Sequence, residues 1–378
     1  MKIGIFGGSF DPIHNDHINM ALSAKQELGL DRLYIVPAKV SPFKKTLKVT
    51  SPSARLDMLK LAFQDTDAIV SDYELTKQGE SYTYETVLQF KKFFPKDTLY
   101  LIIGGDSLKS FKDWKNPDVI VKNAEIVVVE RSGDYISYET EAKAFKKRFG
   151  KNYTKLAHVG GTISATKVRL YATLRLPLDG LVPKSVEEYI YQNGIFEGNP
   201  YLSYLQEVMS TDRMVHTANV VVTALKKAQQ EGMNTDKVIT AAALHDVAKH
   251  IDPDTVDGFT YKGIPRQVVH AYLGAHIMET VLGITDKDIL DAVRYHTTAK
   301  APMTKLGKLI FSADMVEESR TYDGVERLRE IFYTKDLDTA FIECLIEEIQ
   351  HLEQKGYELF GETRNAYDYY VKNKNKIR

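Results

Sequence analysis

The chain has 378 residues, more than the roughly 250–300 at which a single hydrophobic core stops growing, so we expect two domains. A formal net charge of −1, without a long basic run, excludes a protein that coats nucleic acid. A single cysteine, Cys344, excludes a disulfide framework, and no apolar run reaches the about 20 residues that cross a bilayer, so we expect a cytoplasmic protein without a membrane partner.

The first half of the chain alternates short apolar runs with helical patterns. The expected strands are Lys2–Phe6, Arg32–Val36, Ala68–Tyr73, Thr98–Ile103 and Glu125–Val129, and the expected helices include His17–Leu28, Ser53–Phe63 and Thr83–Phe93. Continuous apolar runs such as Leu99–Ile103 are typical of strands buried on both faces of a parallel sheet. This alternation predicts an α/β doubly wound, Rossmann-like parallel sheet, whose ligands bind at the carboxyl ends of the strands.

Residues 1–17 combine a strand, a glycine turn and the start of a helix. Gly7 and Gly8 interrupt the strand, and His14 and His17 stand where a helical pattern begins. Glycines let a backbone approach a phosphate, and the unpaired N–H groups of a helix N-terminus attract anions. For the glycines alone, an ordinary strand–turn–helix entry is equally favoured. The two histidines, three residues apart, favour a phosphate site.

Three further segments are consistent with this site. Ser164 or Thr166 is a suitable N-cap for a second helix, in whose first two turns Arg169 would lie. Pro42–Lys45 adds positive charge after the second strand, and Ile103–Ser107 ends the fourth strand, where a topological switch point would hold a ligand. Taken alone, the serine-capped segment is more simply explained as an ordinary helix start.

Beyond Gly198–Pro200 the pattern changes to apolar residues at spacings of three and four, without a convincing strand. The expected helices are Met214–Gln229, Thr235–Lys249, Pro265–Leu282, Asp286–Tyr295, Thr304–Glu318 and Thr339–Glu353. The Gly-Asn-Pro step cannot continue a helix, so we place a domain boundary there. The first domain is then expected to be residues 1–198 and the second an all-α domain of residues 201–378.

Five successive helices of the second half each carry one or two potential metal ligands. These residues are His216, His245, Asp246, His270, His296 and Asp314. Helical bundles build metal sites from inward-facing side chains of this kind, and mixed histidine and aspartate ligation suits Fe, Mn, Ni or Zn. A lone histidine is usually a surface or hydrogen-bonded core residue, and we keep that interpretation for the remaining ones, His158, His250, His276 and His351.

Many segments of the first half together form a recognisable pattern. They are Gly7–His14, Pro37 with Pro42–Lys44, Arg55–Ala62, Ser81–Thr86, Ile103–Asp106, Trp114, Arg131, Ser164–Arg169, and Leu181–Pro183 through Asn193–Gly194. Through these segments the first half resembles the bacterial nicotinate mononucleotide adenylyltransferases of the nucleotidyltransferase superfamily. The resemblance implies direct transfer of the adenylyl group of ATP to the mononucleotide phosphate, with Mg²⁺ as cofactor and pyrophosphate as product. Catalysis would then consist of positioning and charge stabilisation.

The same resemblance implies roles for individual residues. Those implied to bind the ATP phosphates and stabilise the transition state are His14, His17, Lys44, Ser164 and Arg169. Those implied to line the nucleotide sites are Gly7, Gly8, Ser9, Phe10, Tyr82, Thr83, Thr86, Gly105, Asp106, Trp114 and Arg131. Two positions depart from the family pattern: Asp16 replaces a glycine, and Ala165 replaces a serine. An aspartate beside phosphates is electrostatically unfavourable, although an acid at a helix N-terminus is locally favourable.

Five segments of the second half surround the potential metal ligands, and they are Arg213–His216, Ala243–Lys249, His270–Ala275, Tyr295–Thr298 and Ala313–Arg320. Through these segments the second half resembles the HD-domain metallophosphohydrolases, and in detail the bacterial symmetrical diadenosine tetraphosphate hydrolases. The resemblance implies two transition-metal ions, with iron first among the candidates, that activate water and clamp the phosphate. One would be held by His216, His245, Asp246 and Asp314, and the second by Asp246, His270 and His296. Lys249 and Arg320 would bind phosphates or be ordinary surface charges, and Ala299 replaces a frequent glycine.

We therefore predict a bifunctional enzyme that makes nicotinate adenine dinucleotide and splits diadenosine tetraphosphate into two ADP. Its partners would be small molecules: ATP, nicotinate mononucleotide and dinucleoside polyphosphates. Alternatively, the first half adenylates another small phosphate such as phosphopantetheine, and the second half cleaves another nucleotide or senses nucleotides. A dehydrogenase is less favoured, because Gly4, Gly7 and Gly8 do not form the Gly-x-Gly-x-x-Gly pattern. The sequence leaves open whether the two sites are coupled and whether the chain forms a homo-oligomer.

Overall fold

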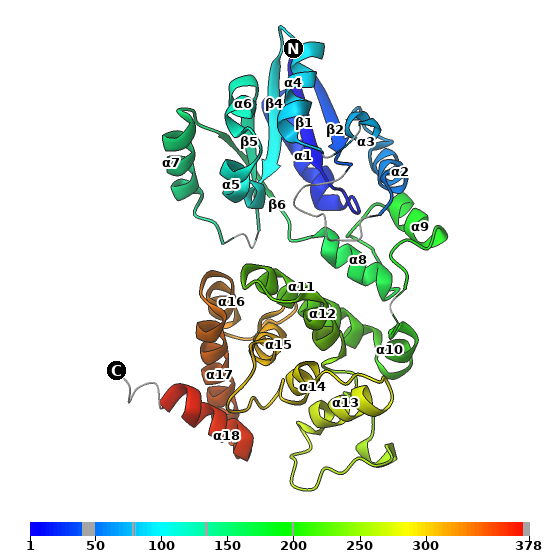
Figure 1. Ribbon diagram of the computed structural model, residues 1–378, viewed down its shortest axis with the longest axis vertical. Helices are drawn as coiled ribbons and strands as arrows, with labels where there is room; N and C mark the ends of the chain where they lie inside the picture. Colours follow the sequence, from blue (N-terminus) through cyan, green and yellow to red (C-terminus); the bar gives the residue numbers. More distant parts are fainter. Residues whose placement is uncertain (40–49, 78, 80, 133–134, 199, 373–378) are drawn as a thin grey trace. The chain divides into compact units, whose positions relative to one another are not determined.

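The computed structural model describes residues 1–39, 50–77, 79, 81–132, 135–198 and 200–372. The chain forms two compact units (Figure 1). The first contains Met1–Ala172 and Pro177–Glu197, and the second contains Thr173–Leu176 and the chain from Gly198 onward. Assignment of residues 1–198 and 201–378 to separate functional domains stays a prediction.

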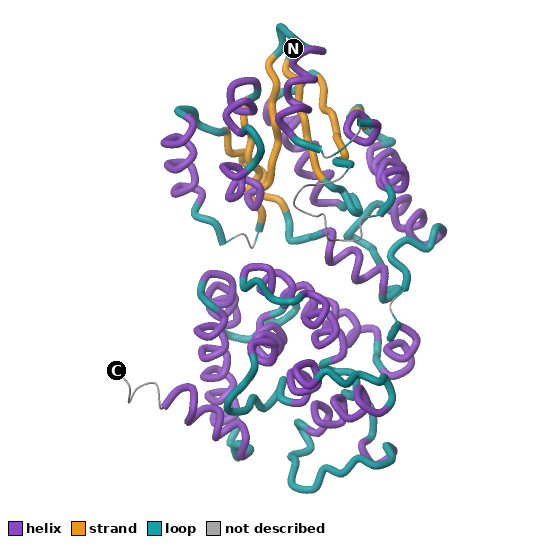
Figure 2. The backbone as a smooth tube through the Cα atoms, in the orientation of Figure 1, coloured by secondary structure: helices purple, strands orange, loops and turns teal. Residues whose placement is uncertain are grey.

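A six-stranded sheet, parallel throughout its described residues, is the centre of the first unit (Figure 2). Its strands are β1 (Lys2–Gly8), β2 (Arg32–Pro37), β3 (Ile69–Val70), β4 (Thr98–Gly104), β5 (Glu125–Arg131) and β6 (Thr154–Gly160). The spatial order is β3–β2–β1–β4–β5–β6. The order reverses between β1 and β4, so the carboxyl ends of these two strands form the topological switch point.

Helices cover both faces of the sheet. The helices of this unit are α1 (Asn15–Leu28), α2 (Pro52–Phe63), α3 (Tyr73–Thr76), α4 (Thr83–Phe93), α5 (Gly105–Ser110), η1 (Phe111–Asp113), α6 (Pro117–Asn123), α7 (Tyr138–Phe149), α8 (Ala165–Thr173) and α9 (Lys184–Gln192). Ile3 and Ile5 of β1 pack in one core with Phe90 of α4 and Phe145 of α7. Successive strand residues face opposite sides, and the ring of Phe6, on the other side, lies near His17 of α1. This arrangement confirms the predicted fold class.

The second unit is helical, and its described residues contain no strand. Its helices are α10 (Leu202–Val208), α11 (Thr211–Gln230), α12 (Thr235–Leu244), η2 (Pro253–Thr255), α13 (Val269–Thr280), α14 (Lys287–Arg294), α15 (Lys305–Val316), α16 (Val325–Thr334), α17 (Leu337–Gln354), α18 (Gly361–Tyr367) and η3 (Asp368–Lys372). Polar N-cap side chains begin many of them, and these are Ser210, Asn234, Asp286, Thr304 and Asp336. Within the described ranges, no helix is long and apolar enough to cross a membrane.

Five element predictions were wrong in detail. Gly7 and Gly8 do not interrupt the first strand, because both pair with β2 and β1 ends only at Gly8. Strand β6 was missed, because this edge strand buries only Leu156 and Gly160 and so lacks a continuous apolar run. Strand β3 is shorter than Ala68–Tyr73, because Tyr73 already begins α3. Helix α12 ends at Leu244 rather than at Lys249, and α13 spans Val269–Thr280 rather than Pro265–Leu282. The segment after α12 continues as turns, which carry His245 and Asp246.

Candidate active sites

The turn after β1 is shaped by Gly8 and Phe10. The backbone of Phe10 is left-handed, with a φ of 47°, and its ring is buried. A Cβ at Gly8 would lie 3.0 Å from atoms of that ring, so the close contact requires glycine. The ring also meets His17 edge-on, with centroids 5.2 Å apart. Phe10 therefore supports the histidine, whereas Gly7 near the end of β1 and Ser9 in the turn are both more exposed than Phe10.

His14 is the N-cap of α1. Its Nδ1 accepts the backbone N–H of His17 at 3.4 Å, and the two imidazole rings stack with centroids 3.5 Å apart. Burial, followed by the positive charge of Arg131, lowers the pKa of His14 to about 3. The ring is therefore neutral near pH 7 and, because Nδ1 is an acceptor, carries its proton on Nε2. A neutral donor thus stands at the N-terminus of a helix, next to a second imidazole.

Helix α8 brings a second N-terminus to the same turn. Ser164 caps it, since its Oγ accepts the N–H of Lys167 at 3.1 Å. Arg169 donates from Nη1 to the carbonyl of Asp11 at 2.5 Å and from Nη2 to the hydroxyl of Thr166 at 3.0 Å. Three of the predicted phosphate-binding residues, His14, His17 and Arg169, are thus connected through the 11–17 turn. Lys44, the remaining predicted cation, lies outside the described residues.

Arg55 organises the loops that follow β1 and β2. Its side chain is buried, and Nη1 donates to the carbonyl oxygens of Ser9 and Ala38, both at 2.7 Å. Burial lowers the pKa of this arginine, and the nearby Asp11 carboxylate acts in the opposite direction. The sequence marked Arg55 only as part of a matching segment. Its position as a cross-link between two loops depends on contacts that sequence spacing does not reveal.

The residues predicted for the pyridine nucleotide are distributed over α4 and the segment that follows β4. Tyr82 precedes α4, and the ammonium group of Lys115 lies 3.9 Å from its ring centroid. Trp114 packs on Phe111, with centroids 5.1 Å apart. The other predicted residues of this group include the first residues of α4 and α5, and they are Thr83, Gly105 and Asp106. Thr86 is buried and donates its hydroxyl proton to Glu74, whose pKa is raised by burial.

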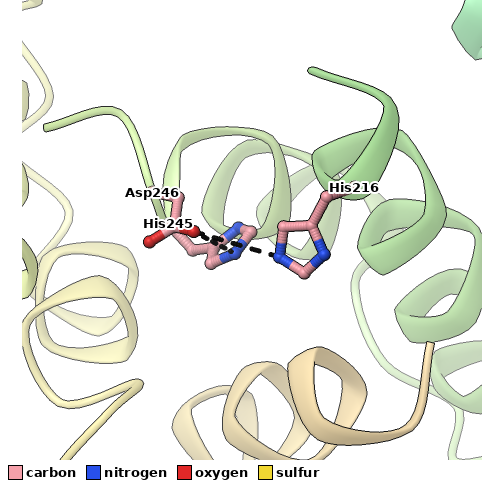
Figure 3. A group of neighbouring side chains, drawn as sticks. All are labelled: His216, His245 and Asp246. Atoms are coloured by element: carbon pink, nitrogen blue, oxygen red, sulfur yellow. Dashed lines mark ion pairs between the residues drawn. The ribbon is translucent and has the colours of Figure 1, made fainter. Parts of the chain in front are cut away.

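In the second unit, the six predicted metal ligands lie around one centre. The six residues form three overlapping groups of three, and within each group the ligand atoms lie within 4.8 Å of one another. The groups are His216 with His245 and Asp246, His245 with His296 and Asp314, and Asp246 with His270 and His296. Asp246 is central: its Oδ2 lies 3.9 Å from Nε2 of His216 and 3.6 Å from Nε2 of His245 (Figure 3). Its Oδ1 lies 3.3 Å from His270 and 3.5 Å from His296. Each carboxylate oxygen therefore faces a different pair of imidazoles.

The outer nitrogen of three of these imidazoles is hydrogen-bonded, and this fixes the direction of the ring. Nδ1 of His245 lies 2.7 Å from the carbonyl of Ala242, and Nδ1 of His296 lies 2.7 Å from that of Val293. Nδ1 of His216 lies 3.1 Å from the buried carboxylate of Glu317. In each case Nε2 is left facing the centre, as metal-binding histidines require. Glu317 was not predicted as part of the site.

The charge states of the cluster suit a cation. Burial lowers the pKa of His245 to about 4 and also lowers that of His270. Burial alone would raise the pKa of Asp246 and Asp314, but their histidine neighbours outweigh it and hold both pKa values below the usual range. Within the part of the chain that the structure describes, Nε2 of His245 is buried without a hydrogen-bond partner. Neutral imidazoles, as at His245 and His270, and ionised carboxylates are the forms that ligate transition metals, so these residues fit a metal centre. His216 differs: burial alone would lower its pKa, but hydrogen bonds to Asp314 and Glu317 raise it to about 9, so His216 would release a proton on binding a metal.

Basic side chains surround this centre. Arg213 donates to Oδ2 of Asp246 at 2.7 Å, and Arg320 donates to Oδ1 of Asp314 at 2.5 Å. The Nζ of Lys249 lies 3.1 Å from Nε2 of His270. Lys249 and His270 also line a cavity of about 450 Å³, to which Arg266 contributes as well. The centre therefore adjoins a basic cavity of the size that holds small ligands.

Two family profiles match the chain. A cytidylyltransferase-like profile matches residues 5–170, and an HD domain profile matches residues 213–319. The HD match and the histidine and aspartate cluster together indicate that the second unit binds divalent metal. The two profiles match the same two regions of the chain whose motifs carry the two resemblances.

Relatives support both regions. A "Probable nicotinate-nucleotide adenylyltransferase" from Clostridium tetani (strain Massachusetts / E88) is 35% identical over 199 residues, covering 52% of this chain and 98% of that protein. A "Probable nicotinate-nucleotide adenylyltransferase/Ap4A hydrolase" from Mycoplasma genitalium is 28% identical over 328 residues, covering 84% of this chain and 88% of that protein. These matches confirm both resemblances. A solved structure of a "predicted HD superfamily hydrolase involved in NAD metabolism" from Clostridium acetobutylicum has 28% identity and a TM-score of 0.41, covering 45% of this chain and 95% of that one.

Proposed function

Because the chain belongs, through its first half, to the nicotinate-nucleotide adenylyltransferase family and carries an HD domain in its second half, we propose that it is a bifunctional enzyme of NAD biosynthesis. Residues 1–198 would transfer the adenylyl group of ATP to nicotinate mononucleotide, giving nicotinate adenine dinucleotide and pyrophosphate. Residues 201–378 would hydrolyse diadenosine tetraphosphate to two ADP. The name of the Mycoplasma genitalium relative, which combines both activities, supports this pairing.

The observation that supports adenylyl transfer best is the connection between the N-termini of α1 and α8. Nε2–H of neutral His14 would donate to a phosphate oxygen of ATP, while Arg169, held by the Asp11 carbonyl, would supply fixed positive charge. Backbone N–H groups at both helix starts would bind further phosphate oxygens. An oxygen of the mononucleotide phosphate would attack the α-phosphorus as its bond to the pyrophosphate group breaks. Mg²⁺ would accompany ATP, and catalysis would consist of positioning and charge stabilisation.

The proposed site of the mononucleotide lies at the carboxyl end of β4, on the other side of the switch point. Trp114 would stack on the pyridine ring, and Tyr82 and Thr83 would contact the ribose phosphate from the start of α4. Thr86 would contribute indirectly, by orienting Glu74, because its hydroxyl proton is already donated to that carboxylate. The carboxyl end of β4 is also where an open parallel sheet with this strand order binds ligands.

The observation that supports the hydrolase is the centrality of Asp246, whose two oxygens face different histidine pairs. We propose two transition-metal ions, iron first, one held by His216, His245, Asp246 and Asp314 and one by Asp246, His270 and His296. When bound, such ions lower the pKa of water and polarise phosphate oxygens. Arg213, Arg320 and Lys249 would orient the polyphosphate, and the basic cavity at Lys249 and Arg266 would hold the part of the substrate beyond the cleaved bond.

A substrate panel on the purified full-length chain tests both assignments. ATP with nicotinate mononucleotide should yield pyrophosphate and nicotinate adenine dinucleotide, and ATP with phosphopantetheine should not. Diadenosine tetraphosphate should yield ADP alone as nucleotide product. Elemental analysis of the purified protein should find about two transition-metal ions per chain. Absence of pyrophosphate would refute the first assignment, and nucleotide binding without turnover would make the second unit a sensor instead.

A further inference from the structure

Asp16 and Arg131 hold the main chain of Ile163 from two sides. Asp16 lies in the first turn of α1 and is only 5% exposed. Its Oδ2 accepts the N–H of Ile163 at 2.8 Å, and the carbonyl of Ile163 accepts a hydrogen bond from Nη2 of Arg131. The same Nη2 lies 4.0 Å from Oδ2 of Asp16. Both main-chain polar groups of Ile163 are thus bound by oppositely charged side chains from α1 and β5.

Ile163 lies directly before the start of α8, so holding its main chain also holds the start of that helix. The next residue, Ser164, caps α8, whose N-terminus carries Thr166 and Arg169. Asp16 follows the N-cap histidine of α1 by two residues. The carboxylate therefore fixes the start of one helix to the loop that precedes the other. A hydrogen bond that involves a charged group contributes more to such positioning than a neutral one.

Gly161 provides a second, independent observation on the same carboxylate. A Cβ built on Gly161 would lie 2.5 Å from Oδ1 and 2.8 Å from Oδ2 of Asp16. A Cβ at this distance would force the carboxylate to shift, because the Asp16 side chain occupies the space that a larger residue at position 161 would need. The loop 161–163 is shaped around Asp16 by both a hydrogen bond and a close steric fit.

We infer that Asp16 is a positioning residue of the adenylyl-transfer site, which, together with Arg131, fixes the loop that presents Ser164 and α8 to the triphosphate. The inference rests on the proposed function of the first unit. It also explains how an acidic residue is tolerated where the sequence suggested repulsion of ATP. The carboxylate accepts the N–H of Ile163 and lies near the guanidinium group of Arg131, so its negative charge is compensated within the protein.

Replacing Asp16 separates this role from a general loss of structure. In the full chain, Asp16→Gly should raise the KM for ATP roughly tenfold, the order expected for losing one charge-assisted hydrogen bond. The KM for nicotinate mononucleotide should stay unchanged. Asp16→Asn keeps an oxygen that accepts the Ile163 N–H and should recover most of the ATP affinity. Asp118→Asn removes a surface carboxylate that pairs with Arg148, and it should change neither KM.

Coupling between positions 16 and 161 provides the sharper test. Gly161→Ala should raise the KM for ATP in the wild-type background, because its Cβ meets the Asp16 carboxylate. In the Asp16→Gly background the same methyl group has room, so the double variant should be less impaired than the product of the two single effects. An unchanged or lower KM for ATP in Asp16→Gly, or independent effects of the two substitutions, would overturn the inference. A wild-type chain without adenylyl transfer would instead overturn the proposed function.

Discussion

Oε1 of Glu317 lies 3.1 Å from Nδ1 of His216, and Glu317 is completely buried. The same carboxylate accepts hydrogen bonds from the backbone N–H and the hydroxyl of Ser319, so its orientation is fixed from the loop after α15. A carboxylate at Nδ1 fixes the tautomer of an imidazole and makes Nε2 a better metal ligand. Burial alone would lower the pKa of His216, but its hydrogen bonds to Asp314 and Glu317 outweigh burial and raise that pKa to about 9.

Glu317→Gln should weaken metal binding without removing a ligand. The amide keeps the volume of the side chain but lacks the negative charge that makes His216 a strong donor, so metal affinity should fall about 10- to 100-fold. Competition with a chelator, followed by elemental analysis, measures this change. Glu318→Gln, at the exposed neighbouring position, is the matched control and should retain wild-type affinity. Equal metal affinity in both variants would show that Glu317 has only a packing role.

Glu317 also illustrates what the sequence could and could not predict. The order of the histidines and aspartates was sufficient to predict that these six side chains come together, because each residue type is visible in the chain. Their role as metal ligands stays a prediction. The contact between Glu317 and His216 joins residues 101 positions apart, and no spacing rule reveals it. Asp16 was judged by its charge alone, since its partner Ile163 is 147 residues away. The fold class followed from the buried strands, whereas the half-exposed β6 had no comparable pattern.

Asp246→Asn should separate the two proposed activities. The amide preserves the shape of the side chain, but it removes the charge to which both histidine pairs and Arg213 are directed. Metal content and hydrolysis of diadenosine tetraphosphate should therefore be lost, while pyrophosphate release from ATP and nicotinate mononucleotide should stay at the wild-type rate. Far-UV circular dichroism should confirm that the helices persist. Loss of both activities in a folded variant would contradict independent sites.

His14 should make the first unit sensitive to acid. Burial, followed by Arg131, lowers the pKa of His14 from 6.5 to about 3 in the folded protein. Below pH 6.5 the unfolded chain therefore binds a proton that the folded chain rejects, so stability is complete above that pH and falls as the pH decreases toward 3. Between pH 7 and pH 5 the loss from this one group should be about 2 kcal/mol.

Denaturation of His14→Asn checks this loss. Asparagine is a good N-cap and does not titrate, so the variant should lose about 2 kcal/mol less than the wild type between the two pH values. The single tryptophan of the chain, Trp114, lies in the first unit, so its fluorescence reports the unfolding of that unit. Parallel pH profiles for the two proteins would mean that, between pH 7 and pH 5, His14 takes up its proton in the folded protein as it does in the unfolded chain.

Ala299 is strained, and its replacement by glycine should cost almost nothing. Its backbone is left-handed, with a φ of 55°, and its methyl group is fully buried three residues after the proposed ligand His296. Glycine would relieve about 1–2 kcal/mol of left-handed strain, which offsets the loss of a buried methyl group and the added freedom of the unfolded chain, about 1–2 kcal/mol together.

Ala292→Gly, on the neighbouring α14, is the control for this prediction. It removes an equally buried methyl group from a helix without relieving strain and should cost about 2 kcal/mol. Thermal unfolding followed by far-UV circular dichroism, with the Trp114 transition identifying the first unit, should show this difference. Equal destabilisation by both substitutions would mean that position 299 tolerates alanine without strain.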